Sequence, residues 1–386
     1  MTYTSGILRP LTLKTLHLRN RAVMAPMTRN RSKNHIPGPD VAQYYQRRAE
    51  GEIGLIITEG TTVGHPASNG YPDVPDFHTQ EALEGWRHVV EEVHKSGGKI
   101  FPQLWHVGSV RQTHLCYNEG VDNPKATCCK ESQTPGYAPS PVPHPYVEGA
   151  EVPHEMTFRD IQEVIQAFVK AAQDAKAMGF DGVEIHGAHG YLIDQFFWSR
   201  TNQRGDEYGG EKLSKMVRFA VELIGAVRNA VGPDFPIDFR FSQWKLGDYS
   251  AKLAQTPQEL EAFLIPIVEA GVDIFHCSTR RFWDPEFPNS SLNLAGWTKK
   301  ITGKTVISVG SVGLDNDFIN TLKMGAKTQA SDSRLKALNE CLENKEIDLI
   351  AIGRSLLADP FWLKKHIEDR SNEVKPFSNE ALDKYY

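Results

Sequence analysis

The sequence predicts one α/β domain over residues 1–386, folded as a (β/α)8 barrel (TIM barrel), and three observations support this prediction. Eight short apolar runs alternate with stretches long enough for a helix. The helices that can be delimited share one pattern, a capping residue, an apolar face and a terminal glycine. Strands buried on both faces and joined by helices are parallel, and eight such units favour a closed barrel. An open doubly wound sheet remains the alternative, because periodicity alone does not prove closure.

The predicted strands are short runs rich in Val, Ile, Leu and Phe that end in polar residues, which is typical of buried parallel strands. In chain order they are RAVMAPM (21–27), GLIITEG (54–60), KIFPQLW (99–105), FDGVEIHG (180–187), PIDFRFS (236–242), VDIFHCS (272–278), TVISVGS (305–311) and DLIAIGR (348–354).

Two helices have clear boundary signals. The segment 157–179 begins with Thr157 and Asp160 at the spacing of a capping box and ends at a glycine. The segment 256–271 begins with Thr256 followed by proline and also ends at a glycine. Each helix is followed at once by an apolar run, so helix, glycine and strand form the repeating unit.

Two other segments interrupt this alternation. Residues 106–154, after the third strand, are rich in Pro and Gly, and long loops in compact domains are usually functional. We therefore expect a lid excursion over the barrel mouth. Residues 327–346 have the pattern of an additional amphipathic helix before the last strand.

Composition narrows the function classes. The formal charge is -5, from 43 basic and 48 acidic residues without long runs of one sign, so we expect no nucleic-acid or membrane partner. The first 20 residues lack the apolar core of a secretion signal, which favours a cytoplasmic protein that acts on a small molecule. Homo-oligomer formation is left open. The cysteines, which predict neither a disulfide framework nor a metal cluster, are Cys116, Cys128, Cys129, Cys277 and Cys341.

Active sites in this fold lie at the C-terminal ends of the strands. The fourth strand ends in the most unusual group, with His186, His189 and Tyr191 within six positions. Arg240 ends the fifth strand and requires a partner, because an isolated buried charge is prohibitive. The other polar or conformationally special residues at strand ends are Pro26, Met27, Thr28, Glu59, Gly60, Gln103, Trp105 and His106.

Glycines gather after the seventh and eighth strands, at Gly310, Gly313 and Gly353, with Arg354 beside the last of them. Glycines let backbone N–H groups approach an anion, and these two loops are where barrels commonly bind phosphate. Together they predict a phosphate-bearing cofactor. A metal-dependent hydrolase with His186 and His189 as ligands is the competing class. Such a site needs further ligands, usually one on the first strand, and the first strand of this chain ends only in Pro, Met and Thr, so we expect no resident metal.

The segment HGAHGYLIDQFFWSRTNQRGDEYGG resembles the active-site signature of the Old Yellow Enzyme family, the FMN-dependent ene-reductases built on a (β/α)8 barrel. Further resemblance extends over almost the whole chain, in MAPMTRNRS, TEGTTVG, PQLWHVG, YAPSPVP, DFRFS, ISVGSVG and AIGRSLLADP. It implies noncovalent FMN, a visiting NADH or NADPH, and reduction of electron-poor alkenes such as enones, quinones or nitro compounds. Oxidative amine N-demethylation and dienoyl reduction are alternatives on the same scaffold.

The resemblance also assigns residues. His186 and His189 match the pair that hydrogen-bonds the substrate oxygen, Tyr191 matches the proton donor, and Trp105 matches a residue lining the substrate pocket. The positions that match FMN-binding residues are Ala25, Pro26, Met27, Thr28, Gly60, Gln103 and Arg240, with Gly310, Ser311, Gly353 and Arg354 at the phosphate.

Some positions depart from the commonest family pattern. Thr28 places the chain in the branch with threonine rather than cysteine beside the flavin, whereas many members of that branch have asparagine where this chain has His189. The loops RFSQWKLGDYS and CSTRRFWDPEF, which include Arg280 and Arg281, are also uncommon versions.

Overall fold

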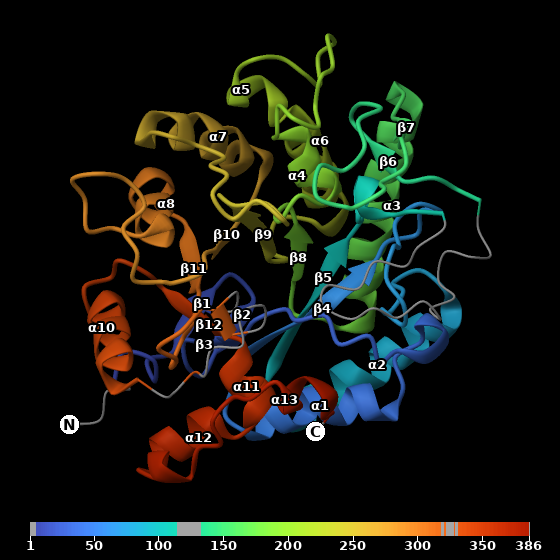
Figure 1. Ribbon diagram of the computed structural model, residues 1–386. Coiled ribbons are helices and arrows are strands. Elements are labelled where there is room, and N and C mark those ends of the chain that lie inside the picture. The colour runs from blue at the N-terminus through green and yellow to red at the C-terminus, as the bar shows by residue number, and fades with distance from the viewer. Residues whose placement is uncertain (1–4, 114–132, 318–319, 322–327, 329–330, 386) are drawn as a thin grey trace.

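The computed structural model describes residues 5–113, 133–317, 320–321, 328 and 331–385, and its centre is a closed barrel of eight parallel strands (Figure 1). Each strand coincides with a predicted run, so the fold prediction is confirmed. The strands are β3 (Ala22–Met24), β4 (Leu55–Thr62), β5 (Lys99–Trp105), β8 (Val183–His186), β9 (Ile237–Ser242), β10 (Ile274–Ser278), β11 (Thr305–Val309) and β12 (Leu349–Ile352), and β12 pairs with β3 to close the barrel.

Helices surround the barrel and connect consecutive strands (Figure 1). The longer ones are α1 (Pro39–Glu50), α2 (Gln80–Lys95), α3 (Phe158–Met178), α6 (Arg218–Val231), α7 (Pro257–Ala270), α8 (Leu294–Thr302) and α10 (Asp332–Glu343). The predicted extra helix before the last strand is therefore present as α10. The shorter ones are α4 (Leu192–Phe196), α5 (Leu213–Met216), α11 (Arg354–Ala358), α12 (Trp362–Ile367), α13 (Glu380–Asp383), η1 (Lys33–His35), η2 (Gly108–Val110) and η3 (Ser371–Glu373).

The predicted helix boundaries are confirmed at α3 and α7. Thr157 and Asp160 form a reciprocal capping box at the start of α3. The Thr256 side chain accepts a hydrogen bond from the backbone N–H of Glu259 at the start of α7. Both helices end at a glycine in the left-handed region, which a residue with a Cβ adopts only at a cost.

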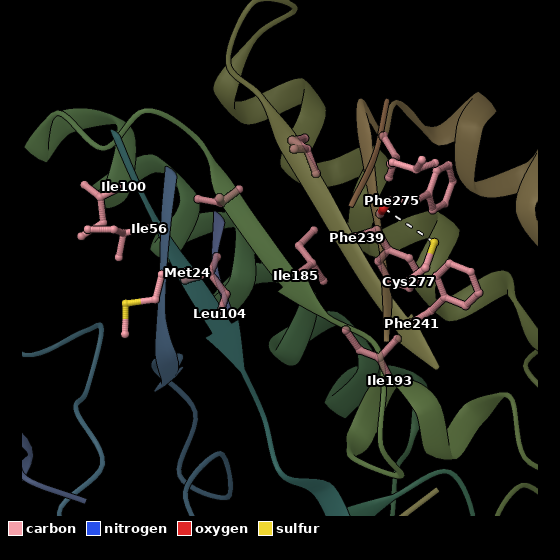
Figure 2. Close-up of a cluster of buried hydrophobic side chains, with 14 of the residues drawn as sticks. Met24, Ile56, Ile100, Leu104, Ile185, Ile193, Phe239, Phe241, Phe275 and Cys277 are labelled. Atoms are coloured by element: carbon pink, nitrogen blue, oxygen red, sulfur yellow. Dashed lines mark hydrogen bonds between the residues drawn. The ribbon is translucent and has the colours of Figure 1, made fainter. Parts of the chain in front are cut away.

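The core has two layers, because side chains alternate between the two faces of each strand. Outward-facing residues such as Ile56, Leu104 and Phe239 belong to the large cluster that includes the surrounding helices (Figure 2). The alternate residues Val23, Leu55 and Phe101 form a second cluster with Leu16 and Leu18.

Leu16 and Leu18 belong to a hairpin that the sequence analysis did not predict. Its strands are β1 (Leu11–Leu13) and β2 (Leu16–Leu18), which pair antiparallel before the first barrel strand. Because their leucines pack on inward residues near the starts of the barrel strands, the hairpin covers the N-terminal end of the barrel. The opposite, C-terminal end is where we expect the chemistry.

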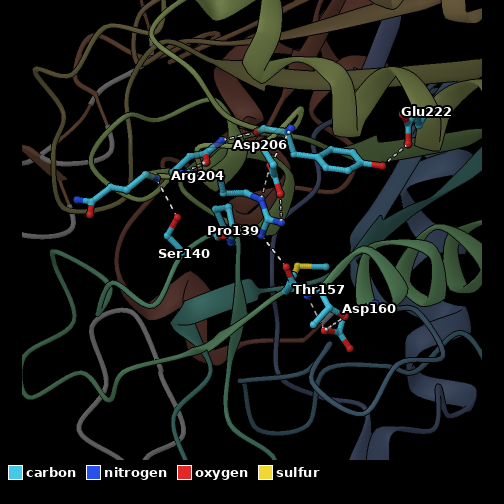
Figure 3. Close-up of polar contacts among 11 residues, drawn as sticks. Pro139, Ser140, Thr157, Asp160, Arg204, Asp206 and Glu222 are labelled. Carbon is cyan, nitrogen blue, oxygen red and sulfur yellow. Dashed lines mark hydrogen bonds and ion pairs between the residues drawn. The ribbon is translucent and has the colours of Figure 1, made fainter.

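The excursion after β5 is described at its two ends, 106–113 and 133–154. Two short strands pair in parallel here: β6 (Tyr137–Ala138) lies within the excursion and β7 (His154–Glu155) lies at its end. Arg204 ties this region to the segment after α4, because its Nη1 donates to the carbonyls of Pro139 at 2.8 Å and Met156 at 2.6 Å (Figure 3). Asp206 holds the same guanidinium with both carboxylate oxygens.

The cysteines Cys116, Cys128 and Cys129 lie outside the described residues, so a role for the vicinal pair stays untested. Cys277 and Cys341 are free thiols. Within the described part of the chain, every helix is too short or too polar to cross a membrane.

Candidate active site

The inward faces of β5, β8, β9 and β10 become polar toward their C-terminal ends. Register places Gln103 beside Glu184, Glu184 beside Asp238, and His186 beside Arg240. Each of these strands therefore contributes two successive inward polar or aromatic residues. Those nearest the C-terminal end are Trp105, His186, Arg240 and Ser278, and those one inward position deeper are Gln103, Glu184, Asp238 and His276.

The predicted substrate residues lie together. The ring of His186 is 5.1 Å from that of His189 and 5.1 Å from that of Tyr191, between ring centroids. Trp105 contacts Tyr191 edge-on at 4.9 Å. The result is a wall of two imidazoles, an indole and a phenol at the ends of β5 and β8, which we call the pocket wall.

Tyr71 is a member of this wall that the sequence analysis missed. Its hydroxyl lies 2.6 Å from the hydroxyl of Tyr191, and its ring is 4.9 Å from that of Trp105. Both tyrosines are buried. Little in the sequence indicated this role, because Tyr71 lies in the connection after β4 and not at a strand end, where active-site residues are expected.

The backbone of His189 has a positive φ of 66°, which is uncommon for a residue with a side chain. Its N–H donates to Ser242 Oγ at 3.0 Å, its Nε2 lies 2.8 Å from Ser278 Oγ, and its ring stacks on Trp244 at 4.2 Å. The contacts with Ser278 and Trp244 hold the imidazole ring, and the hydrogen bond to Ser242 holds its backbone.

A buried ion pair secures the same turn. Asp194 accepts a hydrogen bond from the N–H of Gly190 at 2.6 Å and pairs with Lys245, and both charged side chains are almost fully buried. Breaking such a pair by removing one partner typically costs about 3–5 kcal/mol. The pair therefore holds the turn after β8 against the loop after β9.

Both histidines are neutral at pH 7. Burial lowers the pKa of His186 to about 3, and the charge of Arg240 acts in the same direction. Burial, followed by Arg240, also lowers the pKa of His189 well below its ordinary value. A neutral imidazole donates one N–H, so the pair can bind a substrate oxygen without carrying charge.

The predicted flavin residues are distributed around the same end. Ala25–Thr28 follow β3, and Gly353 lies beside them, since a Cβ there would be 3.5 Å from Met27 Sδ. Gly60 has a different reason to be glycine, because a Cβ would lie 2.5 Å from the ring of Trp105. It makes room for the pocket wall.

Arg240 gives the clearest sign of a missing partner. The residue is buried, and its Nε has no hydrogen-bond partner among the residues that the structure describes. Its Nη2 lies 3.5 Å from Ser278 Oγ, at the limit of a hydrogen bond. A buried guanidinium with an unused donor fits an acceptor-rich cofactor such as FMN.

The predicted phosphate residues also come together. Arg354 donates to Ser311 Oγ at 3.0 Å, to Thr321 Oγ1 at 2.7 Å and to the carbonyl of Asn316 at 2.6 Å. Burial lowers the pKa of Arg354 to about 10, which leaves it charged at neutral pH. Its side chain thus ties the loops after β11 and β12 together and supplies a positive charge.

Arg281, the second of the two arginines after β10, has a clear structural partner. Arg281 forms a two-point ion pair with Asp317, at 3.1 and 2.8 Å, and this pair joins the loops after β10 and β11. Gly310 packs against the same connection, because a Cβ there would lie 2.8 Å from the backbone N of Arg281. Arg281 is therefore a structural residue of the predicted phosphate site.

The segment after β3 is fastened to the C-terminal residues. Arg29, directly after Thr28, donates from Nη2 to the carbonyls of Leu382 at 2.8 Å and Lys384 at 2.9 Å. The ring of Tyr385 stacks on that of Tyr44 at 4.5 Å. We call residues 382–385 the C-terminal strap.

The metal alternative gains no support from the geometry. Within the described ranges, the one group of three side chains that could hold a metal ion is Glu184, Asp238 and His276. Neither His186 nor His189 belongs to it.

Comparison with known proteins identifies the family of the chain. Residues 6–373 match the model of the NADH:flavin oxidoreductase / NADH oxidase family. An NADH oxidase from Thermoanaerobacter brockii is 35% identical over 384 residues, 97% of this chain, although the chain spans only 52% of that relative. The 12-oxophytodienoate reductase 1 of Oryza sativa subsp. japonica is 32% identical over 354 residues, covering 92% of this chain and 84% of the relative.

Solved structures give the same result. Morphinone reductase has a TM-score of 0.76 and 26% identity, covering 98% of this chain and 92% of its own. Its complex with tetrahydroNAD has a TM-score of 0.77. With a family match over nearly its whole length, the chain belongs to the NADH:flavin oxidoreductase / NADH oxidase family, the Old Yellow Enzyme family, whose cofactor is FMN.

Proposed function

We propose that the chain is an NAD(P)H-dependent ene-reductase that reduces electron-poor alkenes, with enones as the first substrates to test and quinones and nitro compounds next. The observation that carries this proposal is the pair of neutral histidines beside the hydrogen-bonded Tyr191 and Tyr71. Reduction of an enone requires a donor at the oxygen and a proton at carbon, and this wall offers both.

The histidines would bind the substrate oxygen, on which negative charge grows during reduction. Donors aimed at such an oxygen typically contribute about 3 kcal/mol each to lowering the barrier. Tyr191 would hold the proton for the α-carbon, with Trp105 and Tyr71 packed around it. FMN, when bound, supplies the hydride from its N5, which no protein side chain can do.

Two similarities support the reductant and the substrate class. The morphinone reductase neighbour is seen in complex with tetrahydroNAD, a nicotinamide analogue. The Oryza relative is named a 12-oxophytodienoate reductase. We further propose that the residues assigned to FMN bind it as the resemblance implies, and that 106–154 acts as a lid within one domain.

The first experiment is absorption spectroscopy of the purified protein, with identification of the heat-released chromophore. We expect FMN, bleached by NADH or NADPH and restored by an enone in a separate half-reaction. A colourless protein that cannot be reconstituted with FMN would refute the proposal. FMN that neither nicotinamide reduces would refute the reductase function and direct attention to amine donors.

A further inference from the structure

Four polar side chains form a buried network inside the barrel, one inward position deeper than the pocket wall. Glu184 is at its centre. Gln103 Nε2 donates to Glu184 Oε1 at 2.6 Å, and His276 Nδ1 lies 2.5 Å from Glu184 Oε2. Asp238, the neighbour of Glu184 on β9, completes the network. Glu184, Asp238 and His276 are fully inaccessible to solvent and Gln103 is nearly so.

Hydrogen bonding decides which of the two carboxyl groups carries the charge. Two N–H donors reach Glu184, whereas no donor among the described residues meets full hydrogen-bond geometry at either oxygen of Asp238, and the backbone N–H of His276 makes only a weaker contact with it. Two ionised carboxylates side by side would also repel each other. Asp238 must therefore be protonated and Glu184 ionised.

The electrostatic environment agrees with this assignment. Burial and the neighbouring Glu184 raise the pKa of Asp238 well above its ordinary value. Burial raises the pKa of Glu184 too, but interactions with His276, Arg240 and Asp238 outweigh it, so its pKa lies below the ordinary value. Burial lowers the pKa of His276, which leaves a neutral ring with its Nδ1–H on Glu184.

The network reaches the predicted flavin residues at two points. Because the Gln103 amide donates to Glu184, its Oε1 is turned to the other side as an acceptor, and the opposite amide orientation would set oxygen against carboxylate. Arg240 lies two residues beyond Asp238, the partner of Glu184 across β8 and β9, and Glu184 makes the largest favourable charge interaction with its guanidinium. Glu184 therefore sets the amide orientation of Gln103 and balances the charge of Arg240.

We propose that Glu184 is a positioning residue for the flavin site, which orients Gln103, balances Arg240, and sets one buried negative charge beside bound FMN so that the flavin becomes harder to reduce. The proposal rests on the FMN chemistry given above. Its physical basis is that electrons are added less readily near a negative charge in a poorly solvated interior.

A metal ion in this network is the competing explanation, because Glu184, Asp238 and His276 could ligate one. The short contact between His276 Nδ1 and Glu184 Oε2 fits a hydrogen bond and leaves no room for an ion between those two atoms. Elemental analysis of the purified holoenzyme tests this directly. One equivalent of a metal ion that disappears in Asp238→Asn would overturn the proposal.

The main experiment measures the two-electron midpoint potential of the bound FMN, at one pH, in the holoenzyme and its variants. In Glu184→Gln/Asp238→Asn no carboxylate remains in the network. We expect the ratio of reduced to oxidised flavin at a fixed applied potential to rise at least tenfold, which is about 30 mV. Asp238→Asn is the matched control, since it replaces one neutral group by another and should leave the potential unchanged.

Three outcomes decide between the explanations. An unchanged potential in the double variant with FMN bound would overturn the role of Glu184 while leaving the reductase function intact. A shift in Asp238→Asn as large as that in the double variant would show that the charge is on Asp238. A wild-type protein unable to bind FMN would overturn both proposals.

A second measurement tests the proton assignment in the wild-type protein, so the proposal can be checked even if the variants do not fold. Infrared difference spectra of flavin reduction should show a perturbed carbonyl band of a buried protonated carboxyl group, absent from Asp238→Asn. A spectrum without that band in the wild type would contradict the proton assignment on which the proposal depends.

Discussion

At the scale of single residues, the two histidines of the pocket wall are held in different ways. His186 is the last residue of β8, so the barrel itself fixes it. His189 lies in the following turn and depends on Ser242, Ser278 and Trp244 for its orientation. Loss of either imidazole should therefore slow the reaction, but only the orientation of His189 should change when residues around it are substituted.

For the histidines, we expect His186→Ala and His189→Ala to weaken binding of phenolic ligands and to slow hydride transfer, each by about 3 kcal/mol in transition-state stabilisation. Ligand titration and stopped-flow kinetics measure the two effects. Ser278→Ala is the control, since it keeps both imidazoles and removes only a hydroxyl that contacts His189 Nε2 and, at 3.5 Å, Arg240 Nη2, so it should cause a smaller loss. Activity that depends on added metal and disappears in both histidine variants would instead favour a hydrolase.

For the tyrosines, Tyr191→Phe should leave flavin reduction by nicotinamide and quinone turnover unchanged, because neither needs protonation at carbon. Enone turnover should fall by about 10²- to 10⁴-fold, the usual contribution of a general acid. Tyr71→Phe keeps the Tyr191 hydroxyl but removes its partner at 2.6 Å, so its loss should be smaller. An equal loss on every substrate in Tyr191→Phe would indicate a packing role.

Sequence reasoning found the residues at strand ends and, of the four residues one inward position deeper, only Gln103. Glu184, Asp238 and His276 lie within runs that were interpreted simply as buried strands. A charged residue inside such a run is itself a signal, since buried charges are rare unless they are paired. The partner of each of these residues could not be predicted from the sequence, because the runs that contain Glu184 and His276 are about 90 residues apart.

At the scale of elements, all eight strands and the caps of α3 and α7 followed from apolar runs and local capping signals, which depend only on neighbours in sequence. The hairpin β1–β2 did not, because its strands have three residues each and gain their stability from the end of the barrel. The register between neighbouring strands could not be predicted from the sequence either, and it is this register that places Gln103 beside Glu184.

Strand β4 offers a test of how an element shapes the pocket. Gly60 follows an irregularity in the pairing of β4 with β5. In Gly60→Ala the new methyl group would collide with Trp105, so we expect a stability loss of about 1–3 kcal/mol and an altered pocket wall. Urea unfolding and ligand binding measure the two effects.

The matched control is Gly225→Ala in α6, where a Cβ would meet nothing within 4 Å. Alanine is the better helix former, so that variant should gain about 0.5–1 kcal/mol. If the two variants behaved alike, the close approach of Trp105 to Gly60 would be wrong.

At the scale of the whole molecule, buried histidines make stability depend on pH. Burial lowers the pKa of six of them, to about 4 in His144 and about 3 in His186. Below pH 6.5 the unfolded chain takes up protons that the folded chain does not, so stability falls as pH falls, by at most about 1.4 kcal/mol per pH unit for each group. The other four are His65, His106, His189 and His276.

Glu59 acts in the opposite direction. Burial raises its pKa to about 7, so the folded state gains a proton between pH 7 and 4.5 and is stabilised as pH falls. Burial also raises the pKa of Asp194, Asp238 and Glu286, which act in the same direction as Glu59. The six histidines outnumber these four carboxyl groups, and we expect the melting temperature to drop steadily from pH 6.5 to 5. The slope should be shallower in His144→Gln. A flat profile over this range would contradict the burial of these histidines as neutral rings.

The C-terminal strap has a further consequence, because Arg29 connects it to the segment of Ala25–Thr28. If FMN orders that segment, it also retains the strap, and linkage requires the effect to be reciprocal. Digestion by a carboxypeptidase should therefore be slower in the presence of saturating FMN, and chains trimmed past residue 382 should release the cofactor more readily. Trimming at the same rate with and without FMN would show that the two ends of this connection act independently.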